Sequence, residues 1–148
     1  MIDGKIEQQR FSQDDVINLL KDNEIKFIDL QFTSLFGRFH HIKLSANMFK
    51  KEDFDSGLPK VDGSSIRGFT EIQESDLIIR PDPSTFATVP WIPEYPTARL
   101  ICDILSGGSN RDQFSRDPRG IAKKAEEYMK ANGYELSYWG TRSRVFCI

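Results

Sequence analysis

The sequence has few cysteines, little net charge and no long apolar runs, and each shortage excludes a class of protein. Two cysteines, Cys102 and Cys147, are too few for a disulfide framework or a metal cluster, so we expect reduced thiols in a cytoplasmic protein. Twenty lysines and arginines against 22 acidic residues give a formal charge of −2, which excludes a broad cationic surface for nucleic acid. No run of 18 apolar residues occurs and the first residues are polar, so we expect no membrane span and no signal peptide.

Local catalytic motifs are also missing. The sequence has no phosphate-binding glycine loop of either common type, no metal-ligand spacing of cysteine and histidine, and no nucleophile elbow. Its two histidines, His40 and His41, are neighbours, and neighbouring side chains on a strand point to opposite faces, so the pair cannot chelate one ion. Local spacing alone therefore identifies no enzyme class.

Eleven phenylalanines in 148 residues are enough for one domain with a core. Capping residues at Ser12 and Asp117 predict helices that end near Lys21 and Ala131, and Ser45 begins a shorter one. Strands are expected at residues 25–32, 38–44, 77–80, 86–89 and 98–104 and from Tyr134, with a loop at 60–68 and a linker at 106–115. In the last helix an inward face is predicted from Ile121, Ala125, Tyr128 and Met129. This order favours an α+β fold with one small sheet.

Within the loop at 60–68, Asp62 is followed by a glycine and two serines. A carboxylate beside small hydroxyl groups can hold an ammonium-like cation or accept its proton. The same residues also form an ordinary turn in which Asp62 bonds its own backbone, and spacing alone favours that interpretation. The acidic group at residues 74–76 and the pair Lys123 and Lys124 are typical of solvated faces.

Five ordered motifs, taken together, resemble the N-terminal part of glutamine synthetase of the bacterial and archaeal type. They lie at residues 61–66 (VDGSSI), 74–77 (ESDL), 81–85 (PDPST), 99–105 (RLICDIL) and 116–126 (beginning RDPR). The resemblance covers nearly the whole chain. It implies a β-grasp (ubiquitin-like) domain at residues 25–105 after an N-terminal helix at 1–24, and a linker with the first helix and strand of a catalytic α+β domain at 106–148.

The resemblance also implies a chemistry. In that family ATP phosphorylates glutamate, ammonia then displaces the phosphate, and Mg²⁺ or Mn²⁺ is bound by glutamates in a funnel between neighbouring subunits of a homo-oligomer. Asp62 matches the family aspartate that helps bind ammonium and take its proton, and Ser65 matches the serine close to that site. An anion beside the phosphorylated substrate favours ammonium binding and then its deprotonation.

The end of the sequence departs from the family. Two glutamates that ligate the catalytic cations are expected after Gly140, and Arg142 and Arg144 stand at those places. Arginine cannot ligate a divalent cation, so we expect no metal or nucleotide cofactor in this chain by itself. Permitted codons for residues 141–148 regain the family motif when one base is removed near Gly140, which suggests a frameshift or a sequencing error that the sequence of the locus would reveal.

The sequence therefore predicts an N-terminal fragment of a glutamine synthetase, inactive as a ligase by itself. The main alternative is a non-catalytic β-grasp module that docks on full-length glutamine synthetase subunits or another partner. A ubiquitin-like adaptor unrelated to nitrogen metabolism is a third, which leaves the five motifs unexplained. We expect the region after Ser106 to be loosely ordered or dependent on a partner, because its apolar faces lack the catalytic-domain elements that cover them in the family.

Overall fold

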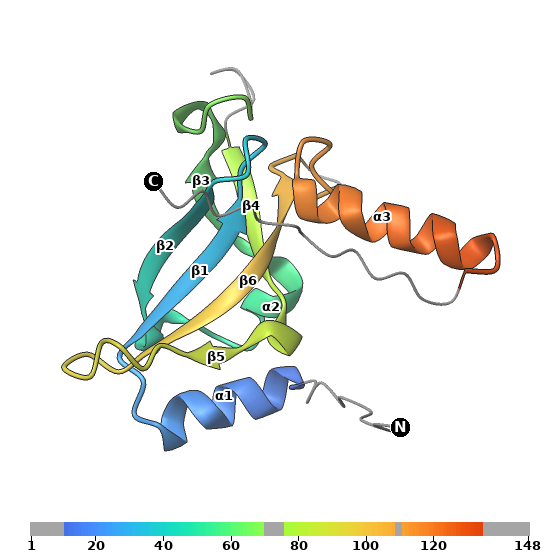
Figure 1. The fold of residues 1–148 in the computed structure, drawn as a ribbon. Coiled ribbons are helices and arrows are strands. Elements are labelled where there is room, and N and C mark those ends of the chain that lie inside the picture. Colours follow the sequence, from blue (N-terminus) through green and yellow to red (C-terminus); the bar gives the residue numbers. More distant parts are fainter. Residues whose placement is uncertain (1–10, 70–75, 109–110, 135–148) are drawn as a thin grey trace, which may run out of the picture.

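The computed structural model describes residues 11–69, 76–108 and 111–134, and these form a curled sheet with three α-helices (Figure 1). The strands are β1 (Phe27–Thr33), β2 (Phe39–Ser45), β3 (Leu58–Asp62), β4 (Asp76–Pro81), β5 (Ala87–Thr88) and β6 (Thr97–Ser106). The α-helices are α1 (Gln13–Asp22), α2 (Asp53–Ser56) and α3 (Pro118–Ala131), with 3₁₀ turns η1 (Ala46–Met48), η2 (Gly63–Ser65) and η4 (Pro83–Thr85). The predicted α+β class is confirmed.

The sheet has the strand order β2-β1-β6-β4-β3, with β5 paired to β6 beside that path. The central pair, β1 and β6, is parallel, and the other pairs are antiparallel. One face of β1 carries Ile28, Leu30 and Phe32, all buried, because alternate residues of a strand point to the same side. These side chains join the core from one strand in the middle of the sheet.

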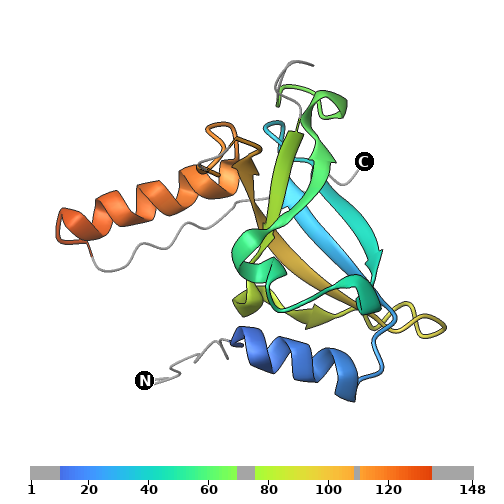
Figure 2. The same ribbon diagram turned by 180° about the vertical axis from the view of Figure 1, so that it is seen from behind.

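Helix α1 lies across one end of the sheet, and α2 lies on the side that faces the viewer in Figure 2. Ser12 and Asp15 form a reciprocal capping box, in which each side chain accepts a hydrogen bond from the other residue's backbone N–H. Val16 and Leu20 of α1 are buried, as is Phe54 of α2. The apolar side of α1 therefore closes the core at this end.

Helix α3 projects away from the sheet, and its C-terminal half has no sheet strand beside it in either view (Figures 1 and 2). The predicted bounds and cap are confirmed, since the side chain of Asp117 accepts the Arg119 N–H and Pro118 occupies the first turn. The face predicted to point inward is left uncovered by the described residues, as expected for a helix without its catalytic-domain neighbours. Ile121 and Tyr128 are 51% and 72% exposed; Ala125 is exposed and Met129 is half-buried.

Three predictions need correction. Residues 60–62 belong to β3, and the loop begins only at Gly63, because Val61 and Asp62 pair with β4. The expected linker folds back onto β6, where the Phe114 N–H donates to the Ile104 carbonyl at 2.9 Å and Gln113 bridges to Leu105. The described part of the region after Ser106 therefore contacts β6, and its looseness stays a prediction. Ser45 stands before a 3₁₀ turn but makes no capping hydrogen bond.

Some predictions fall outside the described residues. They include the strand expected after Tyr134 and the two arginines Arg142 and Arg144. Among the helices that are described, none is long and apolar enough to cross a membrane.

Candidate functional site

The segment at residues 62–69, called the Asp62 loop, begins at the last residue of β3 and continues into η2. Asp62 Oδ1 accepts hydrogen bonds from the Ser64 backbone N–H at 3.0 Å and from the Ser64 hydroxyl at 2.6 Å. Asp62 Oδ2 accepts one from the Ser65 hydroxyl at 2.9 Å. Both predicted site residues, Asp62 and Ser65, are thus in direct contact. The loop also has the ordinary turn geometry that spacing favoured, because Asp62 does bond its own backbone.

The electrostatics of the loop favour a charged carboxylate. The hydrogen bond from the Ser64 hydroxyl, followed by the one from the Ser65 hydroxyl, lowers the pKa of Asp62 below its usual range. The Asp62 side chain is exposed. A carboxylate offers about four lone-pair positions to donors, and the three hydrogen bonds leave room on Oδ2 for one more. Asp62 is therefore an accessible anion that can accept a hydrogen bond from a small cation.

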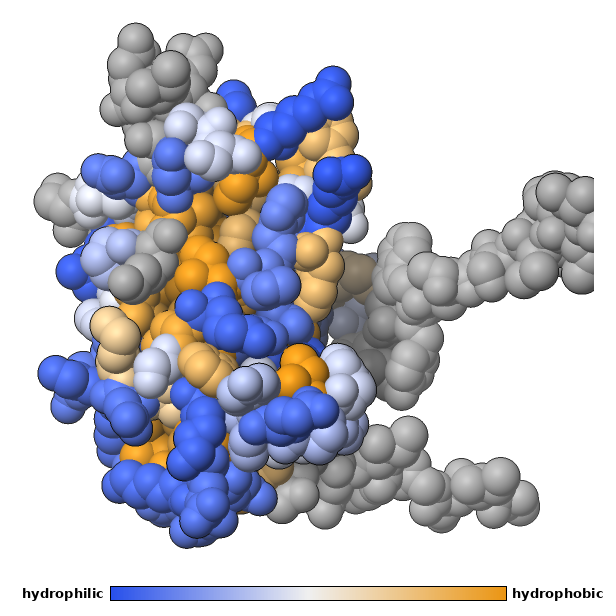
Figure 3. Space-filling view, turned by 90° about the vertical axis from the view of Figure 1, so that its left-hand side faces the viewer, coloured by the Kyte–Doolittle hydropathy of each residue, from blue (hydrophilic) through white to orange (hydrophobic). Residues whose placement is uncertain are grey.

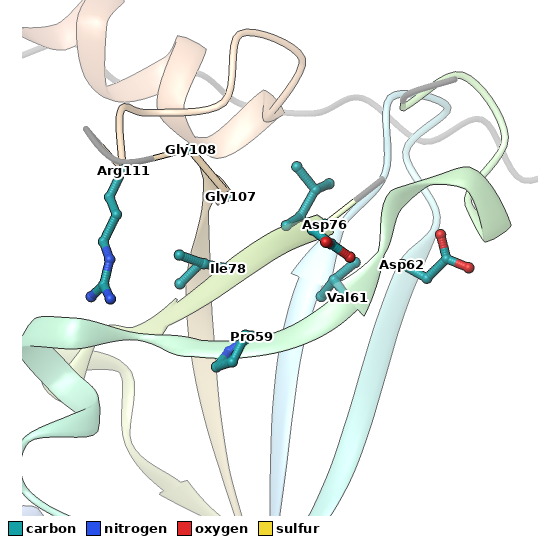
Figure 4. A pocket seen from close by; sticks show the side chains of 9 residues that line it. Pro59, Val61, Asp62, Asp76, Ile78, Gly107, Gly108 and Arg111 are labelled. Atoms are coloured by element: carbon teal, nitrogen blue, oxygen red, sulfur yellow. The ribbon is translucent and has the colours of Figure 1, made fainter. Parts of the chain in front are cut away.

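A cleft of about 680 Å³ runs beside this loop along β3 and β4. In Figure 4, Asp62 lies at one end of the cleft and Arg111 at the other. The Arg111 guanidinium donates to the Ser56 carbonyl at 2.7 Å. Asp76 is the β4 partner of Asp62 in the register, so both residues lie at the same end of the β3–β4 pair.

Gly107 allows the segment after β6 to approach β4 closely. A Cβ atom at this position would lie 2.1 Å from the backbone oxygen of Asp76, and no larger residue fits without a shift. The next residue, Gly108, has nothing within 4 Å of such an atom. The wall of the cleft near Asp76 thus depends on one glycine.

The donor set does not fit a divalent metal. Within residues 11–69, 76–108 and 111–134, no three histidine, cysteine, aspartate or glutamate side chains are grouped so as to hold an ion. Divalent cations need more ligands than the exposed pair Asp62 and Asp76 supplies. His40 stacks on Phe32 with ring centroids 5.5 Å apart, while the side chain of its neighbour His41 is exposed.

A second polar cluster, at the start of α3, was missed by the sequence analysis. Asp103 of β6 is 4% exposed and pairs with Arg119 at 2.9 Å and with Lys123 at 2.6 Å. Arg119 also bonds Asp82, and Arg80 lies 3.6 Å from Asp103. Lys123 is consequently half-exposed and ion-paired, whereas its neighbour Lys124 is exposed as predicted. The sequence did contain one signal of this cluster. Asp103 stands within the mainly apolar segment at 99–105, and a charge buried there requires partners of opposite charge.

Residues 24–107 match the family model of the glutamine synthetase β-grasp domain. The glutamine synthetase of Sulfolobus acidocaldarius is 42% identical over 135 residues, which cover 91% of this chain and 28% of that protein. The 3-hydroxylaminophenol mutase of Cupriavidus pinatubonensis is 37% identical over 133 residues, covering 89% and 28%.

Among solved structures, the glutamine synthetase of Plasmodium falciparum aligns with a TM-score of 0.74 at 24% identity, over 84% of this chain and 24% of that one. At that identity the likeness concerns the fold alone. The chain spans 28% of the length of the Sulfolobus relative. The family model covers more than half of the chain and agrees with the curled sheet, so the chain belongs to the glutamine synthetase family through its β-grasp domain.

Proposed function

We propose that this chain provides the β-grasp part of a glutamine synthetase and that its Asp62 loop binds ammonium at a site completed by a neighbouring subunit. The family match over residues 24–107 supports the assembly. The observation that carries the site is the exposed Asp62 carboxylate, which Ser64 and Ser65 hold in its charged form. This loop lies at the end of a strand, where a second protein can reach it.

The first role proposed for Asp62 is to bind the ammonium cation. Ammonium donates an N–H to Oδ2, and the negative charge offsets the cost of removing the cation from water. A carboxylate of low pKa is a weak base, so the proton moves to Asp62 Oδ2 only as the phosphorylated substrate lies beside the bound ammonium and the C–N bond forms. Neutral ammonia attacks the acyl carbon, the C–O bond to the phosphoryl group breaks and phosphate leaves. Ser65 keeps the carboxylate oriented during this step.

We further propose that ligase activity needs protein beyond these residues. The ATP, glutamate and Mg²⁺ or Mn²⁺ sites of the family are assigned to the remaining part of a full-length subunit, and the partner is a homo-oligomeric assembly of such subunits. A buried thiol at Cys102 suits a reducing compartment, so we place the protein in the cytoplasm. Neither a membrane nor a nucleic acid is required as a partner.

The test transfers residues 24–107 into the Sulfolobus acidocaldarius enzyme in place of its matching segment. In this chimera Asp62→Asn is expected to raise the KM for ammonium at least tenfold, because the carboxylate charge that binds the cation is lost. Asp76→Asn, an exposed carboxylate on the adjacent strand, is the matched control and should leave that KM within about twofold. An unchanged KM and kcat in the Asp62→Asn chimera would refute the proposed site.

A second candidate function is a non-catalytic module that docks on full-length glutamine synthetase subunits. Exposed apolar side chains at the β1–β2 hairpin favour it, since Leu35, Phe36 and Phe39 are 46%, 63% and 56% exposed. Figure 3 shows apolar residues gathered on the face that carries β2 and β3, between hydrophilic margins. Such surfaces are typical of contact sites. Size-exclusion chromatography with the Sulfolobus enzyme distinguishes the cases, because co-elution supports docking and separate peaks contradict it.

A further inference from the structure

The C-terminal end of the Asp62 loop is held by buried groups. The Ile66 N–H donates to the Gly63 carbonyl at 3.2 Å, and the Phe69 N–H donates to the Ile66 carbonyl at 3.0 Å. Phe69 is fully buried. Gly68 has a φ of +84°, which favours glycine. The loop therefore ends in consecutive turns whose last side chain is fixed in the core.

Arg116 reaches this end of the loop from the start of α3. Its Nη1 donates to the Phe69 carbonyl at 2.8 Å and to the Gly68 carbonyl at 3.2 Å, across 47 and 48 residues of sequence. The neighbouring Phe114 ring lies 5.4 Å from the Phe69 ring, measured between centroids. Two adjacent residues of the loop are thus joined to one short segment before α3 by a charged donor and a ring contact.

The segment that carries Arg116 is itself fixed to the sheet. Asp117 is fully buried, and its Oδ2 accepts the Ile104 N–H at 3.1 Å and the Gln113 side-chain amide at 2.6 Å. Gln113 also donates to the Ile104 carbonyl at 2.9 Å. Residues 113–119 are called the α3 root below. Because the α3 root is fixed to the sheet, the hydrogen bonds from Arg116 also fix the positions of the Gly68 and Phe69 carbonyls.

We propose that Arg116 is a positioning residue that couples the α3 root to the Asp62 loop. A displacement of α3 in this subunit then changes the placement of the carboxylate offered to the neighbouring subunit. The ammonium role of Asp62 rests on the proposed function, whereas the mechanical coupling rests on these contacts alone. Arg116 acts through the carbonyls at residues 68 and 69 and touches no substrate.

The test compares three variants of the 148-residue chain. Arg116→Met removes the donors and keeps an unbranched side chain, and Arg116→Lys restores one charged donor. Arg111→Met is the matched control, because Arg111 also donates Nη1 to a backbone carbonyl, that of Ser56 in α2. Hydrogen exchange of the Ile66 and Phe69 amides reports loop closure, and carboxyl NMR reports the pKa of Asp62.

Arg116→Met is expected to speed exchange of both loop amides about tenfold, the loss that removal of a charge-assisted hydrogen bond produces. It should also move the pKa of Asp62 back toward its usual range, because Ser64 and Ser65 are held less firmly. Arg116→Lys should recover part of both effects, and Arg111→Met neither. Exchange within twofold of wild type in Arg116→Met, or an equal effect of Arg111→Met, would overturn the coupling. Both readouts need no ammonium, so a failed ammonium test in the chimera leaves this result standing, and the reverse is also true.

Discussion

Replacing Asp117 by alanine tests how α3 is attached to the sheet. Asp117 is the N-cap of α3, and its carboxylate also accepts the buried Ile104 N–H of β6. Alanine removes the cap and leaves that N–H without its acceptor. The matched change is Ser12→Ala, which removes the N-cap of α1 at an exposed position. Only Asp117→Ala leaves a buried N–H, that of Ile104, without an acceptor.

The two losses at Asp117 have separate magnitudes. Loss of an N-cap costs about 1 kcal/mol, and a buried N–H without an acceptor costs about 1–3 kcal/mol. Asp117→Ala should therefore lower the free energy of unfolding by about 2–4 kcal/mol, and Ser12→Ala by about 1 kcal/mol. Burial raises the pKa of Asp117, because the charged form has lost its water, and this cost offsets part of the loss.

Because burial raises the pKa of Asp117, the stability that this residue contributes depends on pH. The folded pKa of Asp117 lies above its ordinary value of 3.8, so above pH 3.8 the native state holds more protons than the unfolded state. The stability contributed by Asp117 therefore falls as pH rises through its folded pKa. The difference between wild type and Asp117→Ala should be larger at pH 4 than at pH 7.

Urea denaturation and thermal melting measure these effects. A loss of 2–4 kcal/mol corresponds to a drop in Tm of roughly 5–12 °C for a chain of this size. Hydrogen exchange should locate the change in α3 and at Ile104. If Asp117→Ala and Ser12→Ala lower Tm equally, the buried hydrogen bond contributes nothing and the reasoning fails. A pH trend of opposite sign would refute the account of the raised pKa.

Three further variants test single contacts. Asp103→Asn should lower the free energy of unfolding by about 1–3 kcal/mol in urea, because the buried carboxylate loses its charge and with it the attraction of three partly exposed cations, while Lys130→Met, at an exposed pair on α3, should change it by less than about 0.5 kcal/mol. Gly107→Ala should lower Tm, because its Cβ would overlap a backbone oxygen of β4, whereas Gly108→Ala should not. In a Cys147→Ser background, Cys102 should react with a thiol reagent only as fast as the protein unfolds, since burial keeps it inaccessible and raises its pKa.

The fold was largely predictable, because its strands have strong local signals. Alternation located β1 and β2 within two residues of their observed bounds, and the cap at Ser12 located α1. Pairing between distant strands, such as the parallel contact of β1 with β6, carries no local signal, and the sequence analysis did not predict it. Helical spacing shows that one side of α3 is apolar and not that anything covers it.

The candidate site was predictable only in part. The Asp62 turn follows from its own sequence, since aspartate followed by glycine and serine bonds the local backbone. The cluster around Asp103 needs four segments to meet: β4, the N-cap residue of η4, β6 and α3. Arg116 likewise acts on carbonyls 47 residues away, and backbone acceptors have no identity in a sequence. Such partners become visible only when the chain is folded.

The attachment of α3 is polar, and this determines what it can do. Gly120 is the buried residue within the helix, and Asp117, Arg119 and Lys123 supply its bonds to the sheet. These hydrogen bonds and ion pairs set the angle between α3 and the sheet. They stabilise the contact less than burial of an apolar surface of the same area would. A helix held this way has a defined direction at its root. Ile121 and Tyr128 remain exposed on it, so in the proposed coupling a partner bound on that side displaces the α3 root and Arg116 transmits this displacement to the Asp62 loop.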